Sequence, residues 1–144
     1  MIGMKIALCH SMQYAEKAEE VRCWFAARGY EVFPSSFNGE YFGLSDEEKE
    51  RLKLKYKYND DAISEHWKTI NLCDRVLVLN YTKNGIENYL GGNSLIEMGF
   101  AYVLKKPIFL LNEVPYIPYY NTEIKAMVYQ IIYGDLSKVL KDLV

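Results

Sequence analysis

The 144-residue sequence predicts a single α/β domain, spanning 1–144, with a doubly wound parallel sheet of five strands in the flavodoxin-like order 2-1-3-4-5. Short runs of consecutive apolar residues alternate along the chain with longer segments of helical pattern. Strands that are apolar on both faces indicate a parallel sheet covered by helices on both sides. Because crossovers between parallel strands are right-handed, a doubly wound sheet is the simplest arrangement of these elements.

The first elements alternate regularly between strand and helix. An apolar run predicts a strand over 5–9, and a helix follows over 13–28, where Gly29 provides a common C-terminal stop. A second strand is predicted over 30–33 and is closed by Pro34. This opening favours a βαβ arrangement in which the first strand lies inside the sheet.

The next segment is harder to assign. Ser45 and Glu48 have the spacing of a capping box, which predicts that a helix starts there. Residues 51–58 alternate basic and apolar side chains, which is the period of a strand. We favour the helix because of the cap, and we expect Asp60 or Asp61 to cap a further helix.

The rest of the chain continues the alternation, after a helix that ends near Leu72. The predicted elements are a strand over 75–79, a helix over 95–104, a strand over 107–111, a short helix over 122–126, a strand over 127–133 and a terminal helix over 135–143. In the order 2-1-3-4-5 the switch point lies between the first and third strands. A ligand is therefore expected between residues 9–14 and residues 80–97.

Composition narrows the classes of function. Apolar residues make up 50% of the chain and charged residues 25%, as in ordinary globular proteins, and the net charge of −2 gives no general attraction to nucleic acid or to an anionic membrane. No apolar run reaches the roughly 20 residues of a membrane span. We expect a cytoplasmic protein, since the sequence starts without a signal-peptide pattern and its cysteines are few and widely spaced.

Cysteine and glycine motifs exclude several functions of doubly wound folds. Cys9, Cys23 and Cys73 form no metal-spaced pair, and we interpret them as small apolar residues, with no metal site expected. The chain has no Gly-x-Gly-x-x-Gly after its first strand and no phosphate-binding Gly-x-x-x-x-Gly-Lys-Ser/Thr, so no cofactor is predicted. Leu8-Cys9-His10 lacks the paired aspartates of a phosphoacceptor and the arginine of a phosphatase loop.

Glu97 is the only charged residue in the apolar run 95–104. A helix that is apolar all round is usually buried, and a buried carboxylate needs a partner or a function. One interpretation is a capping box with Ser94, which has the required spacing. The other is a carboxylate that the helix dipole keeps ionised at the ligand crevice, which is what nucleophilic attack on an anomeric carbon requires.

A glycine turn precedes this helix. Gly91, Gly92, Asn93 and Ser94 place free backbone N–H groups at a helix N-terminus, where anions bind, and Ser11 at the end of the first strand could add a hydroxyl. A phosphate or a ribose hydroxyl fits such a site. The alternative is a plain tight turn without a ligand.

Three motifs carry a family resemblance: residues 73–80, residues 97–101 and residues 106–108. Together they resemble the nucleoside 2-deoxyribosyltransferase superfamily, which includes the 2'-deoxynucleoside 5'-monophosphate N-glycosidases. The likeness is clearest over 73–111. It implies that Glu97 is the nucleophile that forms a glycosyl-enzyme intermediate, and that the protein is a homodimer or a higher homo-oligomer.

The sequence departs from the family pattern at two places. His66 stands where the family has an aspartate that orients the substrate. His66 could hydrogen-bond a sugar or base, or act as an acid near neutral pH; alternatively it is a helix residue packed beside Trp67. Gly91 and Gly92 also lie further from Glu97 than the family's glycines do.

Candidate pocket walls come from the loops. Asn80, Tyr81 and Tyr89 follow the third strand, and a second tyrosine-rich loop spans 116–120. Tyrosine rings suit stacking on a base, although packing or subunit contact is the alternative for each. A basic segment offers either a rim for a phosphate or a solvated helix face: Arg51, Lys53, Lys55 and Lys57.

The predicted function is cleavage or transfer of the N-glycosidic bond of a nucleoside or deoxynucleoside, or of its 5'-monophosphate, through Glu97. One alternative is a nucleotide-binding or signalling module without turnover. Another is an interaction protein in which Glu97 only caps a helix. The sequence predicts a small-molecule partner and neither nucleic acid nor a membrane.

Overall fold

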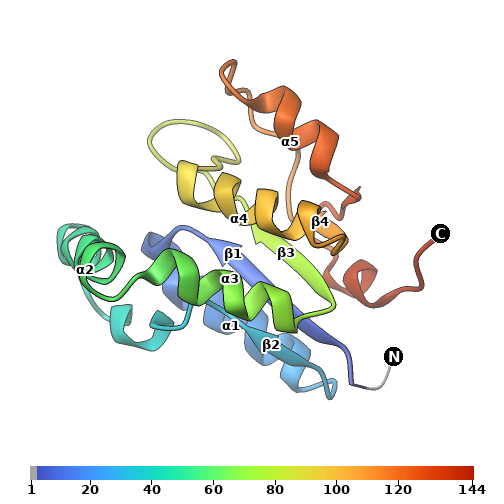
Figure 1. Cartoon of the computed structure of the whole chain (residues 1–144), viewed down its shortest axis with the longest axis horizontal. Coiled ribbons are helices and arrows are strands. Elements are labelled where there is room, and N and C mark those ends of the chain that lie inside the picture. The colour runs from blue at the N-terminus through green and yellow to red at the C-terminus, as the bar shows by residue number, and fades with distance from the viewer. Residues whose placement is uncertain (1–2) are drawn as a thin grey trace.

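A computed structural model describes residues 3–144 of the chain. Its five strands form one parallel sheet in the order β2-β1-β3-β4-β5 (Figure 1). The predicted fold class and strand order are therefore confirmed. Among the described residues, none of the helices is long and apolar enough to cross a bilayer.

The elements follow the predicted alternation. The strands are β1 (Lys5–His10), β2 (Glu31–Phe33), β3 (Arg75–Leu79), β4 (Ile108–Leu110) and β5 (Gln130–Ile131). The α-helices are α1 (Ala15–Ala26), α2 (Asp46–Asn59), α3 (Ala62–Leu72), α4 (Gly92–Val103) and α5 (Asn121–Met127). Short 3₁₀ helices complete the chain: η1 (Met12–Tyr14), η2 (Asn38–Tyr41) and η3 (Leu136–Leu140).

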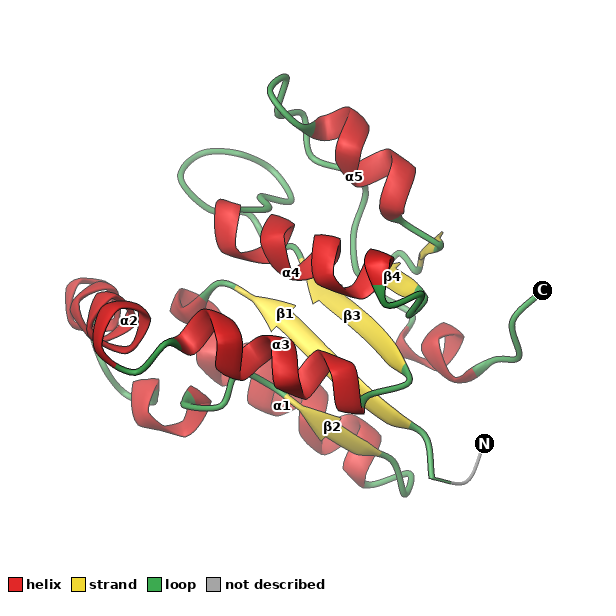
Figure 2. Cartoon of the chain, viewed as in Figure 1, coloured by secondary structure: helices red, strands yellow, loops and turns green. Residues whose placement is uncertain are grey.

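The sheet separates two hydrophobic cores. Side chains alternate along a strand, so Ile6 and Leu8 of β1 face a core shared with α1 and η3. Ala7 and Cys9 face the opposite core, which is shared with α3, α4 and α5. Figure 2 shows α3 and α4 side by side across one face of the sheet, with α1 behind it. This arrangement packs α3 against β1, and α4 against both β1 and β3.

The helical interpretation of the segment after Ser45 is confirmed. Ser45 and Glu48 form the complete capping box, with both reciprocal hydrogen bonds present. Tyr56 then packs on Phe37 with stacked rings whose centroids are 4.0 Å apart. Asp61, in the left-handed region at φ 46°, caps α3 through Ser64 N–H. The alternative of a strand over 51–58, based on the alternation of basic and apolar residues, is wrong, because these local caps and contacts outweigh the alternation.

The C-terminal predictions need correction. The predicted strand over 127–133 is reduced to β5, because α5 takes up Met127 and Tyr133 has a positive φ of 48°, outside the strand region. The predicted terminal α-helix is the 3₁₀ helix η3. The buried guanidinium of Arg75 donates hydrogen bonds to the carbonyls of Val139 and Lys141, at 2.7 and 2.6 Å. These carbonyls are thereby bound to β3, which explains why the segment does not continue as an α-helix.

Candidate functional site

Helix α4 begins earlier than the sequence predicted, and this changes the setting of Glu97. The N-cap is Gly91, and Ser94 is a buried residue inside the first turn. Glu97 therefore lies in the second turn and makes no capping box, so that interpretation is wrong. The helix dipole acts mainly within the first turn. The partly buried carboxylate of Glu97 therefore needs another partner.

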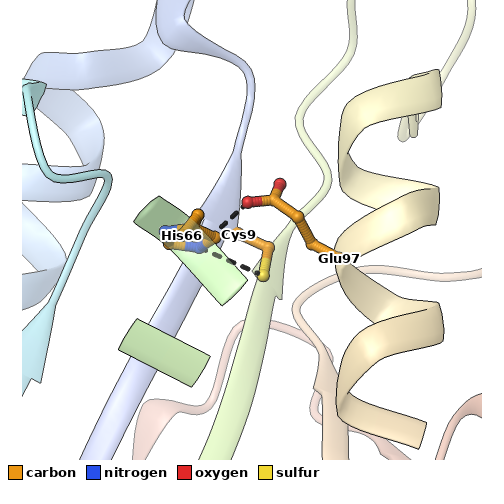
Figure 3. A group of neighbouring side chains, drawn as sticks. All are labelled: Cys9, His66 and Glu97. Atoms are coloured by element: carbon orange, nitrogen blue, oxygen red, sulfur yellow. Dashed lines mark hydrogen bonds and ion pairs between the residues drawn. The ribbon is translucent and has the colours of Figure 1, made fainter. Parts of the chain in front are cut away.

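That partner is His66 of α3. Its Nε2 atom lies 3.0 Å from Glu97 Oε2, and the two side chains are 6% and 15% exposed (Figure 3). Burial lowers the pKa of His66, but the carboxylate of Glu97, with a smaller contribution from the Leu8 carbonyl, outweighs it and raises the pKa above its usual value. Trp67, beside which the alternative interpretation placed His66, is 40% exposed. His66 and Glu97 form a buried ion pair.

Cys9 of β1 lies beside this pair. Its Sγ atom is 3.7 Å from His66 Nε2, and the ligand atoms of Cys9, His66 and Glu97 all lie within 4.8 Å of one another (Figure 3). Burial, with the nearby Glu97 and Cys73, raises the pKa of the Cys9 thiol well above its usual value. Sequence reasoning treated Cys9 only as an apolar residue. Its position at the end of the first strand was the signal that it borders the crevice.

A cavity of about 300 Å³ opens above the pair, at the carboxyl ends of β1 and β3. It lies at the switch point, as expected for this strand order. Nearly all the predicted site residues line it: Ser11, His66, Tyr81, Tyr89, Gly91, Gly92, Asn93, Ser94 and Glu97. The structure thus gathers side chains from β1, α3, α4 and the loop after β3 around one space.

Asn80 is the predicted residue that does not line this cavity. It is buried, and its side chain accepts a hydrogen bond from Asn112 N–H at 2.9 Å. Its amide nitrogen donates to the carbonyls of Asn112 and Glu113, each at 3.1 Å. Asn80 therefore joins the loops that follow β3 and β4.

One end of the cavity is cationic. Lys83, half-buried in the loop after β3, donates a hydrogen bond of 2.8 Å to Ser11 Oγ. Burial and the neighbouring Lys53 lower the pKa of Lys83. Lys53 and Lys57 also line the cavity, whereas Arg51 and Lys55 are exposed. Lys53 and Lys57 thus belong to the cavity rim, whereas Arg51 and Lys55 belong to the solvated helix face. Lys83 is a site residue that the sequence did not indicate.

Aromatic side chains form the walls. Tyr81 packs against Tyr14 with ring centroids 5.0 Å apart, and Phe37 and Tyr41 line the cavity from the η2 region. The second tyrosine-rich loop does not contribute, since none of residues 116–120 lines the cavity. Flat rings around a space of this size suit a planar heterocycle.

Comparison with one solved structure supports the fold. The CMP N-glycosidase BcmB of Clostridium botulinum superposes with a TM-score of 0.51 and 16% identity, covering 94% of this chain and 93% of that chain. The two proteins share a fold. The flavoenzyme NAD(P)H:(acceptor) oxidoreductase FerB of Paracoccus denitrificans gives a TM-score of 0.48 at 12% identity, over 92% of this chain and 77% of that one. No protein-family model and no curated protein matches the sequence.

Proposed function

We propose that this protein cleaves the N-glycosidic bond of a nucleoside or its 5'-monophosphate, with Glu97 as the nucleophile. The observation that carries the proposal is the carboxylate of Glu97 at the cavity wall, 3.0 Å from a buried imidazole whose pKa is raised. The shared fold with an enzyme that acts on CMP adds support, as does the family resemblance of residues 73–111.

The reaction proceeds by double displacement. A carboxylate oxygen of Glu97 attacks the anomeric carbon of the sugar, and the electron pair of the C–N bond leaves with the base. Water then attacks the same carbon and loses a proton, the bond to Glu97 breaks, and the free sugar or sugar phosphate is released. The departed base takes up one proton, so the reaction balances. If a second base attacks instead of water, the same intermediate gives a new nucleoside, and the enzyme is a transferase.

His66 acts on this step through Glu97. Protonated His66 donates a hydrogen bond to Oε2, which fixes the carboxylate and leaves its other oxygen for the attack. The resembled family has an aspartate at this place, so the imidazolium gives this site a cation where relatives carry an anion. We therefore assign His66 a positioning role.

The lining residues divide the substrate between them. Tyr81 contacts the base, while Ser11, Lys83 and the free N–H groups at the start of α4 hold the 5'-phosphate. Tyr89 lies beside Lys83 and Gly91 and therefore borders the phosphate. Lys53, which is paired with Glu50 at 2.8 Å, lies beside Lys83 and also lines the cavity. A monophosphate is therefore preferred over the nucleoside.

A product screen tests the proposal. Wild type, Glu97→Gln and the matched surface variant Glu123→Gln are incubated with ribo- and deoxyribonucleosides and their monophosphates, CMP included, and free base is followed by chromatography. We expect wild type and Glu123→Gln to release base, and Glu97→Gln to be slower by roughly 10³-fold or more, as when a covalent nucleophile is removed. Mass spectrometry of quenched wild type should show a glycosyl adduct.

The remaining outcomes decide among the rivals. An added second base that appears in a new nucleoside identifies a transferase, and its absence identifies a hydrolase. Full turnover by Glu97→Gln would show that the mechanism is wrong. If wild type releases no base from any substrate, the proposal fails, and a ligand-dependent rise in melting temperature would then support the binding-module alternative.

A further inference from the structure

We propose that Cys9, His66 and Glu97 form a binding site for one Zn²⁺ ion. The three residues come from β1, α3 and α4, and their side chains point toward one another (Figure 3). Thiolate sulfur, imidazole nitrogen and carboxylate oxygen are the ligand types that zinc selects. Cys9 and His66 are 57 positions apart in the sequence, so no short metal-binding motif reveals the site.

Two of the three ligand-to-ligand distances are near those around a tetrahedral ion. With bonds of about 2.3 Å to sulfur and about 2.1 Å to nitrogen and oxygen, Zn²⁺ holds sulfur and nitrogen about 3.6 Å apart, and nitrogen and oxygen about 3.4 Å apart. Cys9 Sγ and His66 Nε2 are 3.7 Å apart, and Nε2 and Glu97 Oε2 are 3.0 Å apart. The sulfur and the carboxylate oxygen lie within 4.8 Å of each other and must approach to bind one ion. Shifts of about 1 Å or less bring all three atoms to bonding distance of a common centre.

Binding of the ion leaves this buried place without net charge. In the metal-free state, a neutral Cys9 thiol lies beside the His66–Glu97 ion pair. When Zn²⁺ binds, the thiol proton and the imidazolium proton both pass to solvent. The ion then meets one thiolate, one carboxylate and one neutral imidazole, and the site has no net charge. A neutral site avoids the cost of burying an uncompensated charge.

The cavity provides the entry path and the fourth ligand. His66 and Glu97 both line it, whereas Cys9 does not line it and is 1% exposed. Three protein ligands leave one tetrahedral position for a water molecule from the cavity, which is the arrangement of an open zinc site.

Occupancy removes the nucleophile. A Glu97 oxygen bound to Zn²⁺ has its electron pair committed to the metal, and the His66 proton that positioned it is gone. Zinc should therefore inhibit the reaction reversibly. This consequence rests on the proposed function, whereas the binding of the ion does not.

Cobalt spectroscopy tests the binding without any substrate. Protein freed of metal by a chelator is titrated with Co²⁺, which reports a thiolate ligand by a near-ultraviolet charge-transfer band and four-coordination by visible bands. We expect both in wild type at one ion per chain, with displacement by Zn²⁺. The charge-transfer band should vanish in Cys9→Ser and persist in Cys23→Ser, which removes an exposed thiol outside the cluster.

Calorimetry with Zn²⁺ provides the second measurement. His66→Asn and Glu97→Gln should each weaken binding by at least roughly 100-fold, more than the 10–100-fold typical of outer-shell changes. Circular dichroism tests whether each variant is folded. If Cys9→Ser does not fold, Cys9→Ala takes its place. No cobalt bands in folded wild type, or bands that persist without Cys9, would overturn the site.

Inhibition is measured as a ratio within each variant. Wild-type base release should fall at least roughly 10-fold with one equivalent of Zn²⁺ and return on chelation, since a metal-bound carboxylate is not a free nucleophile. The ratio with and without Zn²⁺ should approach one in Cys9→Ser. Cobalt bands in a protein that cleaves no nucleoside would uphold the metal site while refuting the proposed function. Activity that is insensitive to a bound Zn²⁺ would refute the inhibitory role.

Discussion

At the residue scale, Lys83 shows how one side chain sets the character of the cavity. It is half-buried, contacts Ser11 Oγ at 2.8 Å and lies within 6.0 Å of the Tyr89 ring centre. Its pKa is lowered by burial and by Lys53, so this end of the cavity holds cationic groups at an energetic cost. A dianionic phosphate relieves that cost, which is the physical reason for assigning the 5'-phosphate here.

We predict that Lys83→Gln raises KM for the monophosphate substrate by roughly 10- to 100-fold, the effect of losing a charge-assisted hydrogen bond. The KM for the corresponding nucleoside should change by less than about twofold, because it makes no such contact. Lys55→Gln, at an exposed position on α2, is the control. Equal changes for both substrates would show that Lys83 does not contact the phosphate.

At the element scale, specific residues determine where α4 begins and where it ends. At the N-terminus, Gly91 has an ordinary φ of −87°, but an added Cβ would lie 3.2 Å from the Tyr89 ring, so glycine allows the ring to close over the helix start. At the C-terminus, Lys105 has φ 59°, and the next N–H bonds back to Ala101 at 2.9 Å. This is a Schellman-type end, where glycine is preferred.

We predict that Lys105→Gly stabilises the protein by roughly 0.5–1 kcal/mol. The gain from relieving a left-handed lysine exceeds the added flexibility of the unfolded chain. Urea unfolding measures the change. Lys105→Ala serves as the control, since it keeps the positive φ and a Cβ, and it should give no gain. A loss of stability on introducing glycine would show that the lysine side chain itself supports the helix end.

At the scale of the whole molecule, the His66–Glu97 pair links two helices that cover the same face of the sheet. Glu97 faces His66 from α4 and Cys9 faces it from β1. Since the folded pKa of His66 is raised above its usual value of 6.5, the pair contributes fully below that pH. The contribution is lost as pH rises through the folded pKa. Cys9, whose own pKa is raised well above its usual value, stays neutral over this range.

We predict that Glu97→Gln in chelator-treated protein lowers the free energy of unfolding by up to about 3 kcal/mol near pH 6, because it removes one partner of a buried pair. The difference from wild type should shrink by pH 9. Unfolding in urea at several pH values measures it. Glu65→Gln, which breaks an exposed pair with Lys68, should have a small effect at every pH. A pH-independent difference would mean that His66 is not charged in the folded protein.

Assembly belongs to the same scale. The homo-oligomer implied by the family resemblance stays a prediction, which light scattering tests. The outer end of α4 offers exposed apolar surface for such a contact, with Tyr102 55% and Val103 77% exposed, as does Leu72 at the end of α3.

The sequence by itself determined the features that depend on near neighbours. Continuous apolar runs gave five parallel strands and their switch point, and the spacing of Ser45 and Glu48 gave a helix start against the local alternation. The apolar surroundings of Glu97 marked a carboxylate that needs a partner. Periodicity and caps act over a few residues, so they are readable without the fold.

Only the tertiary structure decided which distant groups meet. Helix packing brings His66 to Glu97, and the register of β1 brings Cys9 to both. The same kind of long-range contact, from Arg75 to the carbonyls after Val139, changes the terminal helix. Such partners depend on strand order and on how helices pack against the sheet. Those are properties of the whole chain, and a local pattern does not contain them.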